Sequence, residues 1–399
     1  MSRSSKPGRI REAGPVDVTL AATLVGLIAF GVVMVYSASA VYANNMFGNG
    51  YHFLVRQAVF ALVAFVVLFV FAQLNIDLLR RSTYPLLLVA VLLMIAVALG
   101  LGRSAGGATR WLALGPVNVQ PAELAKLAMI MWLAHSLAKK SHRVRTFSIG
   151  FLPHVLVAGL LMLLCLAQPD FGSAVMIALL TFVVLFAAGA KAGYLLGCVL
   201  LAVPVGYAAI ASSPYRMRRI KAFLEPFEHR QGAGYQITES LMGFGSGGWT
   251  GVGLGDGRQK LLFLPEAHTD FISAIVGEEL GFIGVILLSS AFAWIVFRGL
   301  RAAWRSQDEY AGYLAAGMTL FIGLQAFTNL AVAMGLLPTK GLALPFVSYG
   351  GSSLLVNAAA AGIILNTSRF GVSRVVEAPA KTKPRRRQPQ LLTARGGAR

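Results

Sequence analysis

The chain has 399 residues, of which 56% are hydrophobic and only 13% are charged, and its formal net charge is +19. This composition excludes a water-soluble globular protein, because such a chain could not hide so much apolar surface from water. The apolar residues also form blocks of about 18 to 25, the length that a helix needs to cross a bilayer. We therefore predict an integral membrane protein.

Ten apolar blocks follow one another and predict about ten transmembrane helices. The blocks are 18–39, 53–73, 84–100, 122–138, 152–168, 173–190, 193–211, 271–297, 310–337 and 348–367. Helices are required because lipid offers backbone N–H and C=O groups no hydrogen-bond partner. We predict an all-α bundle at 17–368, preceded by a basic N-terminus (1–16) and followed by a basic, disordered tail (369–399).

The basic residues predict how the chain is oriented in the membrane. If the N-terminus is cytoplasmic, the short connections on that side collect Lys and Arg, as cytoplasmic loops do. These residues are Arg80, Arg81, Lys139, Lys140, Arg143, Arg145, Lys191, Arg298, Arg301 and Arg305. Both termini are then cytoplasmic, where their charge attracts anionic lipid and gives no reason to expect a nucleic-acid partner. The tail is either a topology anchor or a docking segment for a cytoplasmic protein.

One long connection, 212–269, is predicted to form a large extracytoplasmic loop between the seventh and eighth helices. Long translocated loops largely escape the rule that places Lys and Arg in the cytoplasm, so its basic residues do not contradict this topology. The clustering of Arg216, Arg218, Arg219 and Lys221 at its start still needs a reason. Two interpretations remain open. The cluster either binds an anionic head group such as a diphosphate or is attracted generally to the outer membrane surface.

Charge is costly in or beside apolar blocks, so charged residues there are candidates for function. Glu123 and Lys126 are three residues apart on one helical face and can pair. Their pair serves either the function or the packing of that helix. Asp170, in the tight Gln-Pro-Asp-Phe-Gly connection, either caps the following helix or takes a direct part in the chemistry.

The densest polar cluster runs from Phe263 to Gly281, around the return of the chain into the membrane. Asp270 lies at the start of the eighth block, where desolvation would raise its pKa and neighbouring cations would lower it. Such a carboxylate can act as a general base or hold a divalent cation. Glu278 and Glu279, deeper in the block, require internal partners or protonation.

The connection 338–353 is rich in glycine and proline, which indicates irregular backbone at membrane depth. Such backbone is tolerated only when protein buries it or when it lines a wet cavity. Together with Arg103, Arg110 and Trp111 of the third connection, it is expected to converge on the outer face. We predict a cavity there.

Several long strings resemble the signature segments of the shape, elongation, division and sporulation (SEDS) family, over nearly all of the chain between its termini. They are QPAELAKLA, QPDFGSA, PYRMRRI with AFLEPF, GAGYQ, FLPEAHTDFISAIVGEELGFIG and LPTKGLALPFVSYGGSSLL. Within the family, Lys340-Gly341 and the basic tail are more similar to the division member than to the elongation member. His229-Arg230-Gln231 and Glu239 depart from the family pattern, so the local details of the loop differ.

The resemblance implies a peptidoglycan glycosyltransferase that polymerises lipid II at the outer face of the cytoplasmic membrane, concentrated at the division septum. It implies Asp270 as the essential residue, and a divalent cation, Mg²⁺ or Mn²⁺, with Asp270 as a candidate ligand. It also makes candidates for substrate binding of Glu123, Lys126, Asp170, Arg216, Arg219, His268, Lys340 and Ser348. The implied partners are undecaprenyl-diphosphate-linked glycan, membrane lipid, a class B penicillin-binding protein and other division proteins.

The mechanism expected from these residues has Asp270 activate an acceptor sugar hydroxyl while cations stabilise the diphosphate leaving group. Two other functions compete with this one. A transporter that flips lipid II would suit broken helices, although the inverted repeat expected of many such folds is not visible in the sequence. A non-catalytic scaffold that activates a transpeptidase would need Asp270 only for structure.

Overall fold

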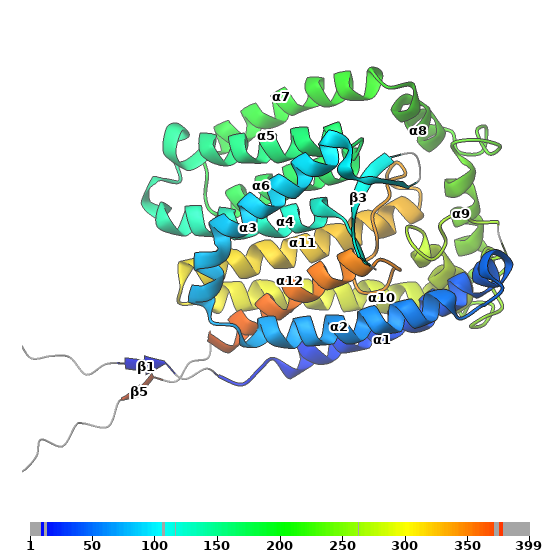
Figure 1. Ribbon diagram of the computed structural model, residues 1–399, viewed down its shortest axis with the longest axis horizontal. Helices are drawn as coiled ribbons and strands as arrows, with labels where there is room; N and C mark the ends of the chain where they lie inside the picture. The colour runs from blue at the N-terminus through cyan, green and yellow to red at the C-terminus, as the bar shows by residue number, and fades with distance from the viewer. Residues whose placement is uncertain are drawn as a thin grey trace, which may run out of the picture.

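The computed structural model describes residues 9–11, 14–105, 108–115, 117–261, 263–370 and 375–377. Its fold is mostly helical (Figure 1). The α-helices are α1 (Val18–Phe47), α2 (His52–Gln73), α3 (Ile76–Ala96), α4 (Pro121–Lys139), α5 (Leu152–Ala167), α6 (Phe171–Ala187), α7 (Ala192–Ala211), α8 (Pro214–Leu224), α9 (Tyr235–Gly247), α10 (Ile272–Arg305), α11 (Glu309–Ala333) and α12 (Gly351–Phe370).

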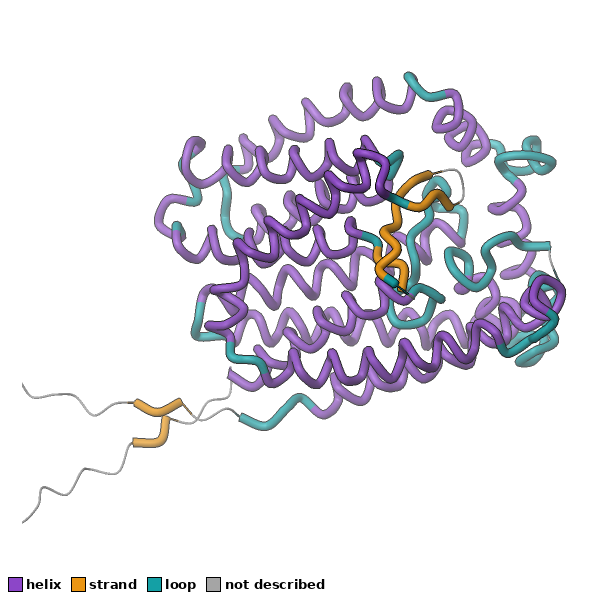
Figure 2. Tube along the Cα trace, in the orientation of Figure 1, coloured by secondary structure: helices purple, strands orange, loops and turns teal. Residues whose placement is uncertain are grey.

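The remaining elements are short. The strands are β1 (Arg9–Arg11), β2 (Arg103–Ala105), β3 (Ala108–Leu114), β4 (Val117–Val119) and β5 (Val375–Glu377). Two π-helical turns, Val97–Leu101 and Phe147–Phe151, extend α3 and precede α5, and a 3₁₀ turn covers Ser141–Arg143. Figure 2 shows β2, β3 and β4 together with most of the longer loops at one end of the bundle.

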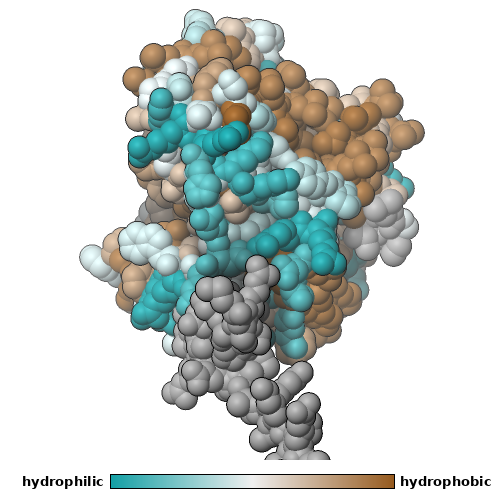
Figure 3. Space-filling model, turned by 90° about the vertical axis from the view of Figure 1, so that its left-hand side faces the viewer, coloured by the Kyte–Doolittle hydropathy of each residue, from teal (hydrophilic) through white to brown (hydrophobic). Residues whose placement is uncertain are grey.

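The long helices lie side by side, and β1 and β5 leave the bundle at one end (Figure 1). We call this the terminal end, where α1 and α11 begin and α4 and α10 end. The opposite end, where α4 and α10 begin, is the far end. Seen from the terminal end, a hydrophilic band is flanked by hydrophobic surface (Figure 3). This distribution fits a bundle whose sides face lipid.

A helix covers most of each of the ten apolar blocks predicted from the sequence. Seven helical segments in the described residues are long and apolar enough to cross a membrane: Val18–Phe47, His52–Gln73, Ile76–Leu101, Phe147–Ala167, Ala192–Ala211, Ile272–Arg305 and Glu309–Ala333. The helix α6 is apolar but shorter. Both α4 and α12 have most of their residues buried in the bundle.

The start of α3 differs from the prediction. The helix begins at Ile76, eight residues before the predicted block, and includes Arg80 and Arg81. Asn75 caps it by accepting a hydrogen bond from the backbone N–H of Asp77 (2.8 Å). The apolar pattern missed this first part because charged residues at a membrane surface can continue a helix beyond the hydrocarbon.

The expectation of a purely α-helical chain was wrong at the third connection. Strands β2, β3 and β4 form a small antiparallel sheet between α3 and α4. Strand β5, within the predicted tail, pairs antiparallel with β1. Most of the rest of the two terminal segments (1–16 and 369–399) lies outside the described residues, so disorder of the tail stays a prediction.

The connection 212–269 is folded. It contains α8 and α9, and α9 packs against α10 and α11. Helix α10 is broken at Gly281 (φ 66°, ψ −164°), and backbone from this connection replaces the interrupted helical hydrogen bonds. The N–H groups of Val252 and Gly253 donate to the carbonyls of Glu278 (3.0 Å) and Glu279 (3.1 Å). The connection is therefore anchored at Glu278 and Glu279, in the first third of α10.

Buried carboxylates reinforce this anchor. Glu278 accepts hydrogen bonds from the backbone N–H groups of Arg258 (2.7 Å) and Gln259 (3.1 Å). Glu279 accepts from the Lys260 ammonium and from the Ser37 hydroxyl, both at 2.7 Å. The internal partners that the sequence required for the two glutamates are thus present.

Candidate active site

Asp270 lies at the far end, immediately before α10. Its backbone N–H donates to the carbonyl of Glu266 (3.1 Å), in a turn that leads into the helix. The side chain is only partly exposed. Desolvation, assisted by the negative charge of Glu266 and opposed by Arg219 and Arg110, raises the pKa of Asp270 to about 7. A carboxylate with this pKa can take up a proton near neutral pH.

The turn at Lys340 and Gly341 lies against Asp270. A Cβ atom added to Gly341 would stand 3.1 Å from Oδ2 of the carboxylate. The N–H of Leu342 donates to the carbonyl of Lys340 (3.0 Å), which closes the turn. The sequence suggested both segments separately, and the structure brings them into contact.

Cationic side chains gather beside this turn. Arg219 of α8 donates to the carbonyl of Thr339 (3.0 Å). Arg216, one turn earlier, donates to the carbonyl of Ala209 (2.7 Å). The Arg216 guanidinium and the Lys340 ammonium both lie over the ring of Phe171, at 5.5 and 5.9 Å from its centroid. Burial lowers the pKa of Lys340 from its ordinary value.

Asp170 is the N-cap of α6. Its carboxylate accepts from the backbone N–H (3.1 Å) and the hydroxyl (2.7 Å) of Ser173, and from the amide of Gln120 (3.4 Å). Arg110 of β3 donates to the neighbouring carbonyl of Pro169 at 2.5 Å. Capping therefore occupies Asp170, while its connection brings Phe171 and Arg110 to the site.

Glu123 and Lys126 form an ion pair of 2.6 Å at the start of α4, and both are almost fully buried. The Lys126 ammonium also lies 5.4 Å from the centroid of the Phe321 ring. Glu123 Oε2 is buried without a hydrogen-bond partner in the described structure. Gln120, which precedes α4, links the start of this helix to Asp170 through its side-chain amide.

His268 and Ser348 contribute to the architecture around the site. The His268 ring packs among Tyr42, Phe53 and Tyr349, and its carbonyl accepts from the N–H of Tyr349 (2.9 Å). Burial lowers the pKa of His268, despite the opposing charge of Glu266. The buried hydroxyl of Ser348 accepts from the N–H of Leu344 (2.8 Å). Neither side chain is directed to Asp270 by a hydrogen bond described here.

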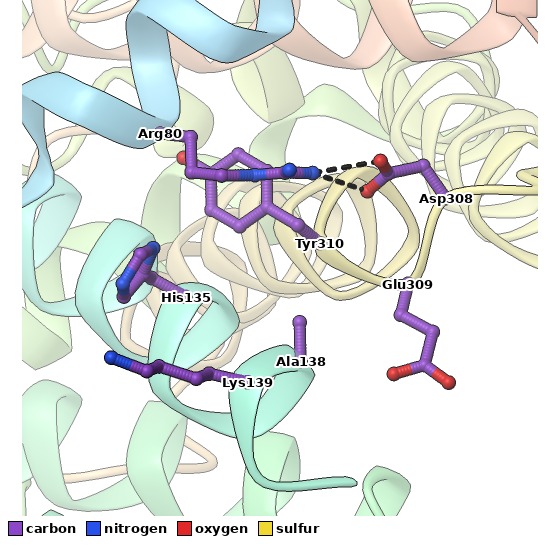
Figure 4. Close-up of a pocket in the computed structure, with 7 residues that line it drawn as sticks. All are labelled: Arg80, His135, Ala138, Lys139, Asp308, Glu309 and Tyr310. Carbon is purple, nitrogen blue, oxygen red and sulfur yellow. Dashed lines mark hydrogen bonds and ion pairs between the residues drawn. The ribbon is translucent and has the colours of Figure 1, made fainter.

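A cavity of about 350 Å³ opens at the terminal end, far from Asp270 (Figure 4). Its lining residues are Arg80, His135, Ala138, Lys139, Asp308, Glu309 and Tyr310. The Arg80 guanidinium pairs with Asp308 at 2.7 Å and lies 4.9 Å from the centroid of the Tyr310 ring. This cavity is not the one predicted on the outer face, which stays a prediction.

A metal site centred on Asp270 would need further oxygen or nitrogen ligands close to its carboxylate. Within the part of the chain that the structure describes, no three His, Cys, Asp or Glu side chains lie close enough together to hold a metal ion. The donor set does not fit a divalent cation held by protein ligands alone, as a site centred on Asp270 would require.

Sequence reasoning missed two residues of the site. Phe171 belongs to the Gln-Pro-Asp-Phe-Gly connection, and its ring lies beneath two cations. Asn329 of α11 has a buried amide that donates to the carbonyls of Asp270 (2.8 Å) and Leu342 (2.7 Å). A polar amide in an apolar helix was the available signal.

The chain is similar to known proteins over most of its length. The family model described as cell cycle protein, of FtsW, RodA and SpoVE, matches residues 18–372. A probable peptidoglycan glycosyltransferase FtsW of Trichlorobacter lovleyi is 47% identical over 364 residues, covering 91% of this chain and 95% of the relative. Its counterpart in Geobacter metallireducens is 46% identical over 360 residues, covering 90% and 96%.

Two solved structures have similar folds. A chain of a peptidoglycan synthase complex that coordinates polymerization and crosslinking superposes with a TM-score of 0.75 and 29% identity, covering 90% of this chain and 98% of that one. The rod shape determining protein RodA of Thermus thermophilus gives a TM-score of 0.64 and 27% identity, with coverage of 90% and 98%.

Proposed function

The chain belongs to the FtsW, RodA and SpoVE family of cell cycle proteins, and we propose that it uses Asp270 as the base of a peptidoglycan glycosyltransferase that polymerises lipid II during cell division. The observation that carries the assignment of the base is the contact between Asp270 and the Lys340-Gly341 turn, with Arg219 beside it. The site thus combines one proton acceptor with several fixed cations.

In the proposed reaction, the acceptor hydroxyl of a lipid II sugar gives its proton to the Asp270 carboxylate. The hydroxyl oxygen forms a bond to the anomeric carbon of the growing strand. The bond from that carbon to the phosphate oxygen breaks, and undecaprenyl diphosphate leaves with the electron pair. Arg216, Arg219 and Lys340 stabilise the negative charge that develops on the leaving group, because fixed cations need no reorganisation during the step.

The buried pair of Glu123 and Lys126 has a supporting part in this proposal. Lys126 neutralises Glu123 in the interior, and the pair fixes the start of α4, whose preceding residue Gln120 contacts Asp170. In this proposal, the pair supports the site by fixing the position of Gln120 and, through it, of the Asp170 connection. Ser348 and His268 would bind substrate only if its presence rearranged their present contacts.

For the membrane arrangement, we propose that α4, α6 and α12 also cross the bilayer, which gives ten spans. The seven apolar segments and the family already make this a membrane protein. With the basic terminal end in the cytoplasm, the far end and the connection 212–269 face outward, where lipid II is polymerised. Concentration at the division septum belongs to the same proposal.

For partners, we propose a class B penicillin-binding protein that crosslinks the strands made here, together with other division proteins. The support is the similarity to a chain of a peptidoglycan synthase complex. A divalent cation, Mg²⁺ or Mn²⁺, is proposed only as one held mainly by substrate oxygens and water. This is tested by measuring polymerisation after EDTA has removed divalent cations and again after Mg²⁺ or Mn²⁺ has been added back.

The test of the function is polymerisation of lipid II by the purified full-length chain with its transpeptidase partner in lipid nanodiscs. We expect Asp270→Asn to abolish glycan formation while the protein stays folded and bound to its partner. The matched control is Asp256→Asn, the same change at an exposed aspartate of the connection 212–269. Full activity of Asp270→Asn would exclude Asp270 as the base, and lipid translocation without glycan would indicate a flippase.

A further inference from the structure

Asn329 connects the two segments that form the site. It lies on α11 and is 1% exposed. Its Nδ2 atom donates to the carbonyl of Asp270 (2.8 Å) and to the carbonyl of Leu342 (2.7 Å). Its Oδ1 atom accepts from the hydroxyl of Ser273 (3.1 Å), which fixes the orientation of the amide. The two amide protons and the oxygen therefore all have partners.

The segments that Asn329 joins lack their own regular structure at these positions. Asp270 lies in the turn before α10, and Leu342 lies in the extended connection between α11 and α12. A buried backbone carbonyl without a hydrogen-bond donor destabilises the fold. Outside helices and sheets, a side chain that donates to such a carbonyl can therefore fix the position of the backbone. One side chain on a rigid helix does this for both segments.

A neighbouring amide provides a useful comparison. Gln325 lies one helical turn before Asn329 and donates to the carbonyl of Ala343 (3.2 Å). It therefore supports the same connection without contacting the Asp270 segment through any described hydrogen bond. Loss of Gln325 would loosen the connection, whereas loss of Asn329 would also release Asp270.

We propose that Asn329 is a positioning residue of the glycosyl transfer, which holds the Asp270 carboxylate against Gly341. This inference rests on the proposed function of Asp270. Displacement of the base by about 1 Å is enough to cost roughly 100-fold in rate, since proton transfer depends on the geometry of the attacking hydroxyl. The amide contributes no proton and touches no reacting atom.

The pKa of Asp270 depends on the charged groups around its carboxylate and on the exposure of the carboxylate to water, so it reports whether the carboxylate keeps its position. Glu266 precedes it on the same turn, Arg219 acts on it from α8 and Arg110 from β3. Lys340 belongs to the facing turn, and its ammonium lies over the ring of Phe171 (5.9 Å). Release of the facing turn admits water to the carboxylate. Its pKa then falls from about 7 toward the ordinary value of 3.8, because desolvation is the main cause of the increase.

The experiment measures polymerisation by the full-length chain and its partner as a function of pH. For Asn329→Ala, we expect the rate at the optimum to fall by about 10- to 100-fold and the acid limb of the profile to move to lower pH. For the matched control Gln325→Ala, we expect an unmoved acid limb. A loss of folded protein would lower the rate of either variant without moving the limb.

An unmoved acid limb in Asn329→Ala, with a rate reduced only in proportion to the folded fraction, would overturn the inference. If Asn329→Ala does not fold, Ser273→Ala takes its place, because it removes only the hydroxyl that orients the amide. A shifted limb in that variant supports the inference and an unmoved one overturns it. An active Asp270→Asn variant would instead contradict the proposed role of Asp270 as the base. The failure of the proposed function can therefore be distinguished from the failure of the inference about Asn329.

Discussion

The backbone of Gly341 lies against the carboxylate of Asp270, so closely that a Cβ atom at position 341 would be 3.1 Å from Oδ2. At that distance one of the two groups must shift by a few tenths of an ångström. Gly341 is exposed and needs no left-handed backbone, so alanine fits its conformation.

We therefore expect Gly341→Ala to lower kcat for polymerisation by about tenfold or more, with little change in melting temperature. The reason is displacement of the proposed base rather than loss of packing. The matched control is Gly245→Ala on α9, where an added Cβ meets nothing within 4 Å. Unchanged turnover in Gly341→Ala would show that the carboxylate can move without cost.

The pKa of Asp270, raised to about 7 by desolvation, predicts opposite effects on activity and stability. Polymerisation should increase as pH rises through about 7, because the base must be ionised. Between pH 3.8 and about 7 the carboxyl group is ionised in the unfolded chain but protonated in the folded one. Folding then binds a proton, so stability falls as pH rises through this window and stays reduced above it.

Asp270→Asn removes that loss of stability. We expect the inactive variant to melt at a higher temperature than the parent chain near about pH 8 and at a similar temperature near about pH 4. Thermal unfolding of the detergent-solubilised chain at the two pH values measures the difference. Equal melting temperatures at the higher pH would mean that Asp270 is well solvated and has an ordinary pKa.

The helical bundle could be predicted from the sequence because it depends on the composition of continuous stretches of the chain. A run of apolar residues long enough to cross a bilayer has no alternative to a helix. The same rule began the third block too late, at residue 84, because it excludes Arg80 and Arg81. The helix starts before them, at Ile76, and Asn75 caps its N-terminus.

The contacts of the site depended on relations that one sequence does not contain. Asp270 could be predicted from its charge beside an apolar block and from the family resemblance. Its contact with Gly341 could not, since 71 positions separate the two residues and only the packing of α10 against α11 brings them together. The break at Gly281 was hidden for the same reason, because its missing hydrogen bonds are replaced from residues 248–253.

The buried ion pair of Glu123 and Lys126 predicts unequal effects of single and double substitutions. Lys126→Met leaves the Glu123 charge buried and unpaired, which should destabilise the fold by about 3–5 kcal/mol. The double variant Glu123→Gln with Lys126→Met should recover most of that loss, because no isolated charge remains.

Thermal unfolding of the single and double variants measures this coupling. The polymerisation rate of the double variant then shows whether the ion pair supports only the fold or also takes part in the reaction. Restored stability with restored activity would indicate that the pair only supports α4. Restored stability without activity would assign the charge of Lys126 to the reaction. Equal destabilisation of both variants would contradict the coupling itself.

Phe171 predicts a third kind of effect, on substrate affinity. Its ring lies beneath the Arg216 guanidinium (5.5 Å) and the Lys340 ammonium (5.9 Å). Two like charges repel one another, and the negative face of an aromatic ring offsets part of that repulsion, with about 0.5–1 kcal/mol for each cation at a partly exposed position. In the proposed reaction, the ring would keep two cations together for a diphosphate that carries more than one negative charge.

Phe171→Leu keeps an apolar side chain but removes the ring. We expect it to increase KM for lipid II about three- to tenfold, as the loss of roughly 0.5–1 kcal/mol for one or both cations implies. Phe171→Tyr should keep the parent KM, because a phenol ring still attracts cations. A KM in Phe171→Leu equal to that of the parent chain would mean that other contacts hold Arg216 and Lys340 in position. For Arg216, such a contact is its hydrogen bond to the carbonyl of Ala209.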